Sequence, residues 1–179
     1  ERLDVLRSWS RRLHEAGYAG ITWSLEVGGR GLAPRFQAIA HEEQARAGAP
    51  GHIGVIGLGM AGPTIAVHGT EAQRSRYLLP ILSAAELWCQ GFSEPDAGSD
   101  LAALRTSARL EGDVLVVDGQ KVWSSYAHVA DHCLLLVRSD PASQGREGLT
   151  MLLLDMRSPG VEVRPLRHLT GEAEFNEVF

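Results

Sequence analysis

Apolar side chains recur at helical spacing in the first half of the chain and gather in short runs in the second half. Leu3, Leu6, Trp9 and Leu13 lie three or four residues apart, with arginines between them. This pattern predicts an amphipathic helix over residues 2–16. The same periodicity, behind a proline suited to a first helical turn, predicts a second helix over residues 34–47.

Residues 57–62 read GLGMAG and match the G-x-G-x-x-G fingerprint of dinucleotide-binding loops. Such a site also needs an acidic residue about twenty positions past the first glycine, to bind the ribose. That position holds Tyr77, and Pro63 falls where the next helix should be under way. We therefore favour a buried helix over residues 53–68, whose glycines allow close helix packing. The dinucleotide site stays as the alternative.

Thr70 is a candidate N-cap for the helix that follows, and Pro80 is expected to begin its end. Beyond about Glu86 the helical period fades and short apolar runs separated by turns predict strands. Glu111-Gly112-Asp113 is typical of a hairpin turn. The strands are expected at residues 106–110, 114–117, 121–125, 130–138, 149–155 and 161–164, with the second of them buried and a polar loop over residues 139–148.

This succession predicts an N-terminal all-α helical domain over residues 1–86 and a small antiparallel β-barrel or sandwich over residues 87–179. Composition is that of a globular protein, with 44% hydrophobic residues and 22% charged ones. A net charge of −5 without a basic cluster excludes a nucleic-acid face. No apolar run is long and glycine-free enough to span a membrane, and the N-terminus is not a signal peptide, so we expect a cytoplasmic protein.

Cysteine and histidine usage adds little chemistry. Cys89 and Cys133 are expected to be buried reduced thiols, with a disulfide as the alternative. His128 and His132 lie four residues apart, but no third ligand is near them in sequence. A zinc site is therefore disfavoured, and we expect no metal.

The segment from Trp88 to Leu101, WCQGFSEPDAGSDL, is the strongest candidate for chemistry. Its glycine, proline, serine and aspartate residues bend the chain and leave backbone N–H groups pointing outward. Such groups can bind an anion or a polarised carbonyl. An ordinary surface turn is the alternative.

Two stretches together carry a resemblance to a known family. Residues 92–100, FSEPDAGSD, and residues 119–125, GQKVWSS, resemble in order and separation the two flavin-binding motifs of the acyl-CoA dehydrogenase family. Residues 69–82 are similar to its Gly-Thr-Glu-x-Gln helix, and residues 170–179 to the strand after its flavin site. The resemblance covers essentially the whole chain. It spans the family's N-terminal helical domain and middle β-domain, while its C-terminal four-helix domain is absent.

The resemblance implies an FAD-dependent enzyme that oxidises an acyl-CoA thioester to trans-2-enoyl-CoA, in fatty acid or sterol degradation. Trp123 would pack against the flavin ring, although a core tryptophan in a strand is the alternative. Ser125 would donate a hydrogen bond near flavin N5, and Ser99 would also reach the CoA side of the substrate. The implied cofactor-binding residues are Gln90, Phe92, Ser93, Gly98, Ser99, Trp123, Ser124 and Ser125.

No residue here matches the family's catalytic glutamate, which lies on the C-terminal helical domain or an adjoining loop. Glu94 belongs to the flavin motif, so we expect no catalytic residue in this segment and no turnover by the segment alone. The implied partners are the acyl-CoA, an electron-transfer flavoprotein or similar acceptor, and further subunits of a homo- or hetero-oligomer. Two alternatives stay open: a non-catalytic subunit of a hetero-oligomeric dehydrogenase, and a flavin oxidase or monooxygenase.

Overall fold

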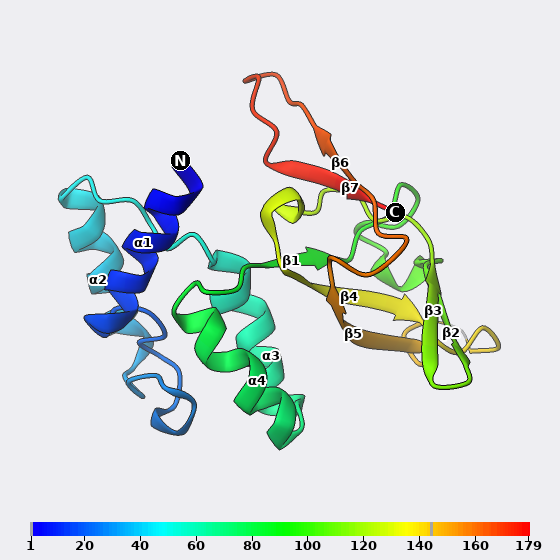
Figure 1. The fold of residues 1–179 in the computed structure, drawn as a ribbon, viewed down its shortest axis with the longest axis horizontal. Coiled ribbons are helices and arrows are strands. Elements are labelled where there is room, and N and C mark those ends of the chain that lie inside the picture. Colours follow the sequence, from blue (N-terminus) through cyan, green and yellow to red (C-terminus); the bar gives the residue numbers. More distant parts are fainter. Residues whose placement is uncertain (1, 144) are drawn as a thin grey trace. The chain divides into compact units, whose positions relative to one another are not determined.

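The structure, a computed structural model, describes residues 2–143 and 145–179. It forms two compact units, one up to Leu87 and the other from Trp88 to Phe179 (Figure 1). The first unit is built of helices and the second of strands, as the two kinds of periodicity predict. The fold class expected from the sequence is confirmed. No helix in these ranges is long and apolar enough to cross a membrane.

The described residues of the helical unit form the α-helices α1 (Arg2–Glu15), α2 (Pro34–Arg46), α3 (Gly62–His68) and α4 (Glu71–Leu82). A capping box begins α4, as predicted at Thr70. The Thr70 hydroxyl accepts from Gln73 N at 3.2 Å, and the Gln73 side chain accepts from Thr70 N at 2.8 Å. Pro80 lies inside α4, which runs on to Leu82, so the helix ends slightly later than expected.

The GLGMAG stretch lies within a helix. Residues 55–68 are helical, and Gly57–Ala61 (η2) forms a π-helical turn that leads into α3. No strand lies between residue 2 and the glycines, so the dinucleotide-binding alternative is wrong. At position 62 the helix requires glycine, because a Cβ atom there would lie 2.0 Å from Cη2 of Trp23. The Trp23 indole N–H donates to Leu58 O at 3.2 Å, which fixes the ring against this helix.

The second unit is organised around β4, which pairs with β1 in parallel and with β5 antiparallel. The main sheet has the order β1-β4-β2-β3 with β5 on β4, and β6 and β7 form a separate two-stranded sheet. Among the residues described no pairing closes a barrel, so the sandwich alternative fits. The sheet is mixed and not purely antiparallel as predicted, because β4 pairs in parallel with both β1 and β2. The strands are β1 (Trp88–Gly91), β2 (Ser107–Glu111), β3 (Val114–Asp118), β4 (His132–Arg138), β5 (Leu149–Asp155), β6 (Val163–Leu166) and β7 (Phe175–Val178).

Two strand predictions are wrong in detail. The hairpin turn at Gly112 joins β2 to β3 as expected, but β3 is not buried: Val114 is 63% exposed and Leu115 49%. The reason is position, since β3 is the outer strand of its sheet and, among the described residues, pairs with β2 alone. Residues 121–125 form no strand either, because in that stretch Lys121 alone makes a bridge, to Val178. The predicted loop over 139–148 includes residue 144, which lies outside the described residues.

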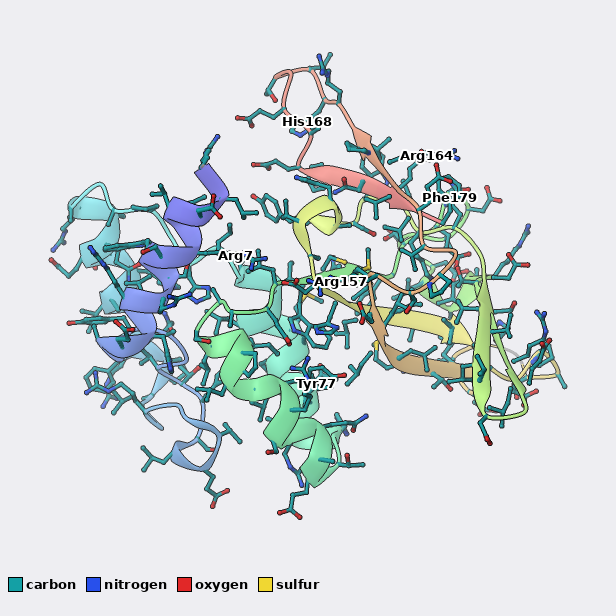
Figure 2. The ribbon with its side chains drawn as sticks, in the orientation of Figure 1. Arg7, Tyr77, Arg157, Arg164, His168 and Phe179 are labelled. Atoms are coloured by element: carbon teal, nitrogen blue, oxygen red, sulfur yellow. The ribbon has the colours of Figure 1, made fainter. Side chains whose placement is uncertain are left out.

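The core of this unit lies between β1, β4, β7 and the turn around Ala127. Cys89 and Cys133 are direct partners in the parallel β1–β4 pair. Both are buried free thiols, as predicted. The hydrogen bond with Cys89 and burial raise the pKa of the Cys133 thiol, so this thiol is protonated at neutral pH. At one edge of the unit Arg164 on β6 lies over the ring of Phe179, 4.4 Å from its centroid (Figure 2).

Candidate functional site

The two motif segments, far apart in sequence, lie side by side in the β unit. Residues 92–100 follow β1, and residues 119–125 follow β3. The backbone joins them directly, because Val122 N donates to Ser93 O at 2.9 Å. The structure therefore brings Phe92 and Ser93 of the first motif together with the second motif.

A buried ion pair joins the same two segments. Lys121 Nζ lies 2.9 Å from Glu94 Oε1 and donates to Phe92 O at 3.0 Å. The side chains of Lys121 and Glu94 are only 2% and 8% exposed. Glu94 also accepts from the backbone N–H groups of Arg105 and Thr106, at 2.6 and 2.8 Å. Glu94 is thus fully engaged in holding three stretches of backbone together.

The pKa values of the pair follow from these contacts. Burial alone would raise the pKa of Glu94, but hydrogen bonds from Thr106, the Arg105 backbone and Lys121 outweigh it and lower the pKa to about 2. Burial lowers the pKa of Lys121, against the opposing hydrogen bond and charge of Glu94. A carboxylate this acidic is a poor proton acceptor near neutral pH, which agrees with a structural role for Glu94.

Two glycines permit this close packing. A Cβ atom on Gly91 would lie 2.7 Å from a Leu135 methyl and 3.1 Å from Cys133 Sγ. A Cβ atom on Gly119 would lie 2.7 Å from Cα of Thr106, which is backbone and cannot move aside cheaply. Glycine at these two positions lets β4 and the start of β2 approach the motif segments.

Trp123 is presented at the surface. Its φ of +61° lies in the left-handed region, which is uncommon for a bulky residue. The side chain is 59% exposed and meets Phe175 edge-on, with ring centroids 6.1 Å apart. The alternative of a core tryptophan in a strand is therefore wrong. A large aromatic face held out in this way is suited to stacking against a flat ligand.

Polar groups without protein partners lie in the second motif segment and on β1, just before the first. Ser124 is 1% exposed, and its hydroxyl has no hydrogen-bond partner in the described part of the chain. The buried Oε1 of Gln90 also lacks one within those ranges. Buried polar atoms normally have partners, so such atoms point to a ligand or to ordered water. Ser125, which follows Ser124, and Ser93, three residues after Gln90, are half-buried.

Gly98 and Ser99 are placed differently. Both are exposed, on the turn that follows the Glu94–Ala97 bridge, and a Cβ atom on Gly98 would meet nothing within 4 Å. Within the described ranges no hydrogen bond joins them to residues 123–125. The structure therefore divides the predicted set into a packed group near Trp123 and an open turn. Together, an exposed aromatic face, unpartnered polar atoms and an open glycine turn fit a cofactor with a flat ring and an anionic tail.

Sequence reasoning missed Asn176 on β7. Its side chain is fully buried, and its Nδ2 donates to Ser124 O at 2.9 Å. Alternation along β7 was the available signal, because it places Asn176 on the same buried face as Val178. A polar residue at an inward position needs partners, and here the partner is the second motif.

His128 and His132, the pair considered as metal ligands, each contact a neighbouring side chain instead. His128 Nδ1 lies 3.1 Å from Asn176 Oδ1, and His132 stacks on Trp88 with ring centroids 5.0 Å apart. Among the residues placed by the structure, no group of three or more histidine, cysteine, aspartate or glutamate side chains converges as a metal site would require.

Comparison with known proteins gives one consistent result. The family model for the acyl-CoA dehydrogenase N-terminal domain matches residues 1–85, and the model for the acyl-CoA dehydrogenase middle domain matches residues 89–178. Acyl-CoA dehydrogenase IpdE1 of Mycobacterium tuberculosis is 46% identical over 179 residues, which are 100% of this chain and 46% of that protein.

Solved structures agree with the sequence comparison. The crystal structure of the ChsE4-ChsE5 complex from Mycobacterium tuberculosis has a TM-score of 0.88 at 32% identity, covering 98% of this chain and 45% of that one. The Tcur3481-Tcur3483 steroid ACAD has a TM-score of 0.88 at 32% identity, covering 97% of this chain and 45% of that one. This chain spans about half the length of the relatives it matches. From both domain matches and the shared fold, the chain belongs to the acyl-CoA dehydrogenase family.

Proposed function

We propose that the protein containing this chain dehydrogenates an acyl-CoA thioester to the trans-2-enoyl-CoA, with FAD held at the paired motif segments. The observation that carries the proposal is Trp123, an exposed aromatic ring on a left-handed residue beside unpartnered polar groups. FAD, when bound, supplies the acceptor for the hydride that leaves the β-carbon of the acyl group. The protein positions and tunes that acceptor.

The proposed roles follow the chemistry of each group. Trp123 stacks on the flavin ring, and Phe92 and Gln90 line the pocket beside it. Ser93, Ser124 and Ser125 supply hydrogen bonds to the polar edge of the ring, with Ser125 placed near N5. A fixed donor at a position where negative charge accumulates on reduction stabilises that charge. Gly98 and Ser99, on the open turn, approach the flavin pyrophosphate and the CoA side of the substrate.

The α-proton is removed by a base outside this chain segment. Glu94 is unsuited to that task, because its pKa is about 2 and its carboxylate is occupied by Lys121 and two backbone N–H groups. The segment by itself would then bind the cofactor ring without completing the reaction.

The substrate class and partners are proposed from the relatives. A steroid ACAD and the ChsE4-ChsE5 complex share this fold at 32% identity. We assign a branched or steroid-derived acyl chain to the substrate, and an oligomer of like or unlike subunits to the assembly. Electrons leave through an electron-transfer flavoprotein or a similar acceptor. The second candidate function, favoured by the two-component complex, is a partner subunit that lends structure but does not turn over.

The deciding experiment is the visible absorption spectrum of the purified full-length protein before and after anaerobic addition of an acyl-CoA. A flavin spectrum that bleaches supports the proposal, and one that is stable to a panel of acyl-CoAs supports the non-catalytic subunit. Absence of any flavin contradicts both roles. The variant Trp123→Leu should lose flavin affinity, whereas Leu115→Ser, also at an exposed apolar position of this unit, should not.

A further inference from the structure

The segment that carries Trp123 has one residue more than its partner strand. Lys121 N bonds to Val178 O, Ser124 N to Asn176 O and Tyr126 N to Glu174 O, at 2.8, 3.0 and 2.7 Å. Between the first two bonds the segment advances three residues while β7 advances two. The extra residue makes a bulge, a device that re-aims side chains at the edge of a sheet. Val122 and Trp123 are the residues inside it.

The bulge is conformationally costly. Both Trp123 and Tyr126 have positive φ, at +61° and +58°. Such conformations persist where surrounding contacts determine them, and they gather at ligand sites. Contacts from other residues of this unit must therefore stabilise the backbone conformation of the bulge.

Asn176 makes such contacts. Its backbone O accepts from Ser124 N, while its side-chain Nδ2 donates to Ser124 O at 2.9 Å and to Glu174 O at 3.2 Å. Its Oδ1 lies 3.1 Å from His128 Nδ1, so the amide is tied on both sides. The side chain is 0% exposed. Asn176 thus fixes both backbone groups of Ser124, the residue that directly follows the bulge: its backbone O holds the N–H, and its buried side-chain amide holds the carbonyl.

We infer that Asn176 is the positioning residue of the cofactor site, holding Trp123, Ser124 and Ser125 in the conformation that meets the ring, with His128 orienting its amide. This rests on the proposed function. Asn176 touches no ligand itself in this view: it acts through the backbone of Ser124. The hydrogen bond from His128 keeps the amide oxygen away from Ser124 O, so that Nδ2 faces it.

Four versions of the full-length protein test the inference: wild type, Asn176→Ala, His128→Ala and Glu177→Gln. The last is the control. Glu177 is the neighbour of Asn176 on β7, and its substitution weakens the contact with Gln120 but leaves the hydrogen bonds of Ser124 in place. His128→Ala covers the case in which Asn176→Ala fails to fold, since His128 is the exposed residue of the 3-10 turn Ala127–Val129 (η4). FAD binding is measured by titrating apoprotein, and the bound flavin is compared by visible circular dichroism.

We expect Asn176→Ala to weaken FAD binding roughly tenfold or more, and His128→Ala a few-fold, the ratios that loss of one or two hydrogen bonds gives. The visible dichroism should change in both, because the donors around the ring shift. Glu177→Gln should leave both properties unchanged. A folded Asn176→Ala variant with wild-type affinity and dichroism overturns the inference.

Amide hydrogen exchange separates this inference from the proposed function. In apoprotein, exchange in the peptide spanning residues 121–126 should accelerate in Asn176→Ala and His128→Ala, and stay unchanged in Glu177→Gln. If the wild type binds no FAD, the proposed function fails, and with it the cofactor role of Asn176. If exchange and FAD binding are unchanged in both variants, the positioning role of Asn176 is refuted, while the proposed function stands.

Discussion

Lys121 and Glu94 form a buried ion pair of 2.9 Å that joins the two motif segments of the β unit. Each motif thus contributes one charge to a contact inside the protein, and neither charge is available for chemistry on a substrate. The pair explains why a lysine and a glutamate stand at buried positions of these segments.

Replacing Lys121 with methionine should destabilise the protein by about 3 kcal/mol or more, because it leaves the Glu94 carboxylate buried without its counter-ion. Chemical denaturation monitored by fluorescence measures the change. The matched control is Arg109→Met, which breaks an exposed pair with Glu111 and should cost under about 1 kcal/mol. The double variant Lys121→Met with Glu94→Gln should recover part of the loss. Equal effects of Lys121→Met and Arg109→Met would contradict the buried-pair argument.

The pH dependence of stability has a definite sign. The folded-state pKa of Glu94 is about 2, below its ordinary value of 4.5, so the folded state favours the ionised form. The stabilisation is present above about pH 4.5 and is lost as the pH falls toward 2. The free energy of unfolding should therefore drop in this window by roughly 2 to 3 kcal/mol from this group. Urea unfolding of wild type and Glu94→Gln between pH 2 and 6 checks this: the gap between them should close on acidification, and a constant gap would refute it.

Two glycines of one helical stretch should respond oppositely to alanine. Gly62→Ala places a Cβ atom 2.0 Å from the Trp23 ring and should destabilise by roughly 1 to 3 kcal/mol. Gly59→Ala meets nothing within 4 Å and should be neutral or stabilise by up to about 1 kcal/mol, because alanine favours helix. Thermal unfolding of the two variants side by side is the measurement. Destabilisation of similar size in both would show that Trp23 does not set the requirement.

The capping box of α4 gives a further prediction. Thr70→Ala removes the hydroxyl that accepts from Gln73 N and should cost about 1 kcal/mol. Thr70→Ser keeps an oxygen in reach and should cost much less. Comparison of their denaturation midpoints isolates the cap from the loss of the methyl group.

Local patterns predicted the helical half well. The apolar periodicity of α1, the proline of α2 and the cap at Thr70 each act within a few residues, so the sequence displays them directly. The β unit was harder because its arrangement depends on neighbours distant in sequence. Whether residues 114–117 are buried depends on which strand covers them, and no property of those residues records that β3 lies at the outer edge of its sheet.

In the candidate site, too, local features could be predicted from the sequence and contacts between distant segments could not. The motif residues were found from their order in the chain, but the contact between Glu94 and Lys121 could not be derived from spacing. Asn176 was missed because alternation along β7 indicates an inward position but does not identify the residue that Asn176 contacts. Its importance arises from the bulge at Trp123, and a one-residue mismatch between two segments becomes visible only when their hydrogen bonds are known.

The π-helical turn at Gly57–Ala61 has a consequence for how this chain tolerates changes in length. A wide turn of this kind holds one residue more than a regular helical turn spans. Deleting one residue there would restore ordinary helical bonding, so the fold should tolerate a single-residue deletion at this turn. The same deletion elsewhere in the helix would rotate the downstream face by about 100°. Natural variation in the length of this helix should therefore concentrate at the glycines.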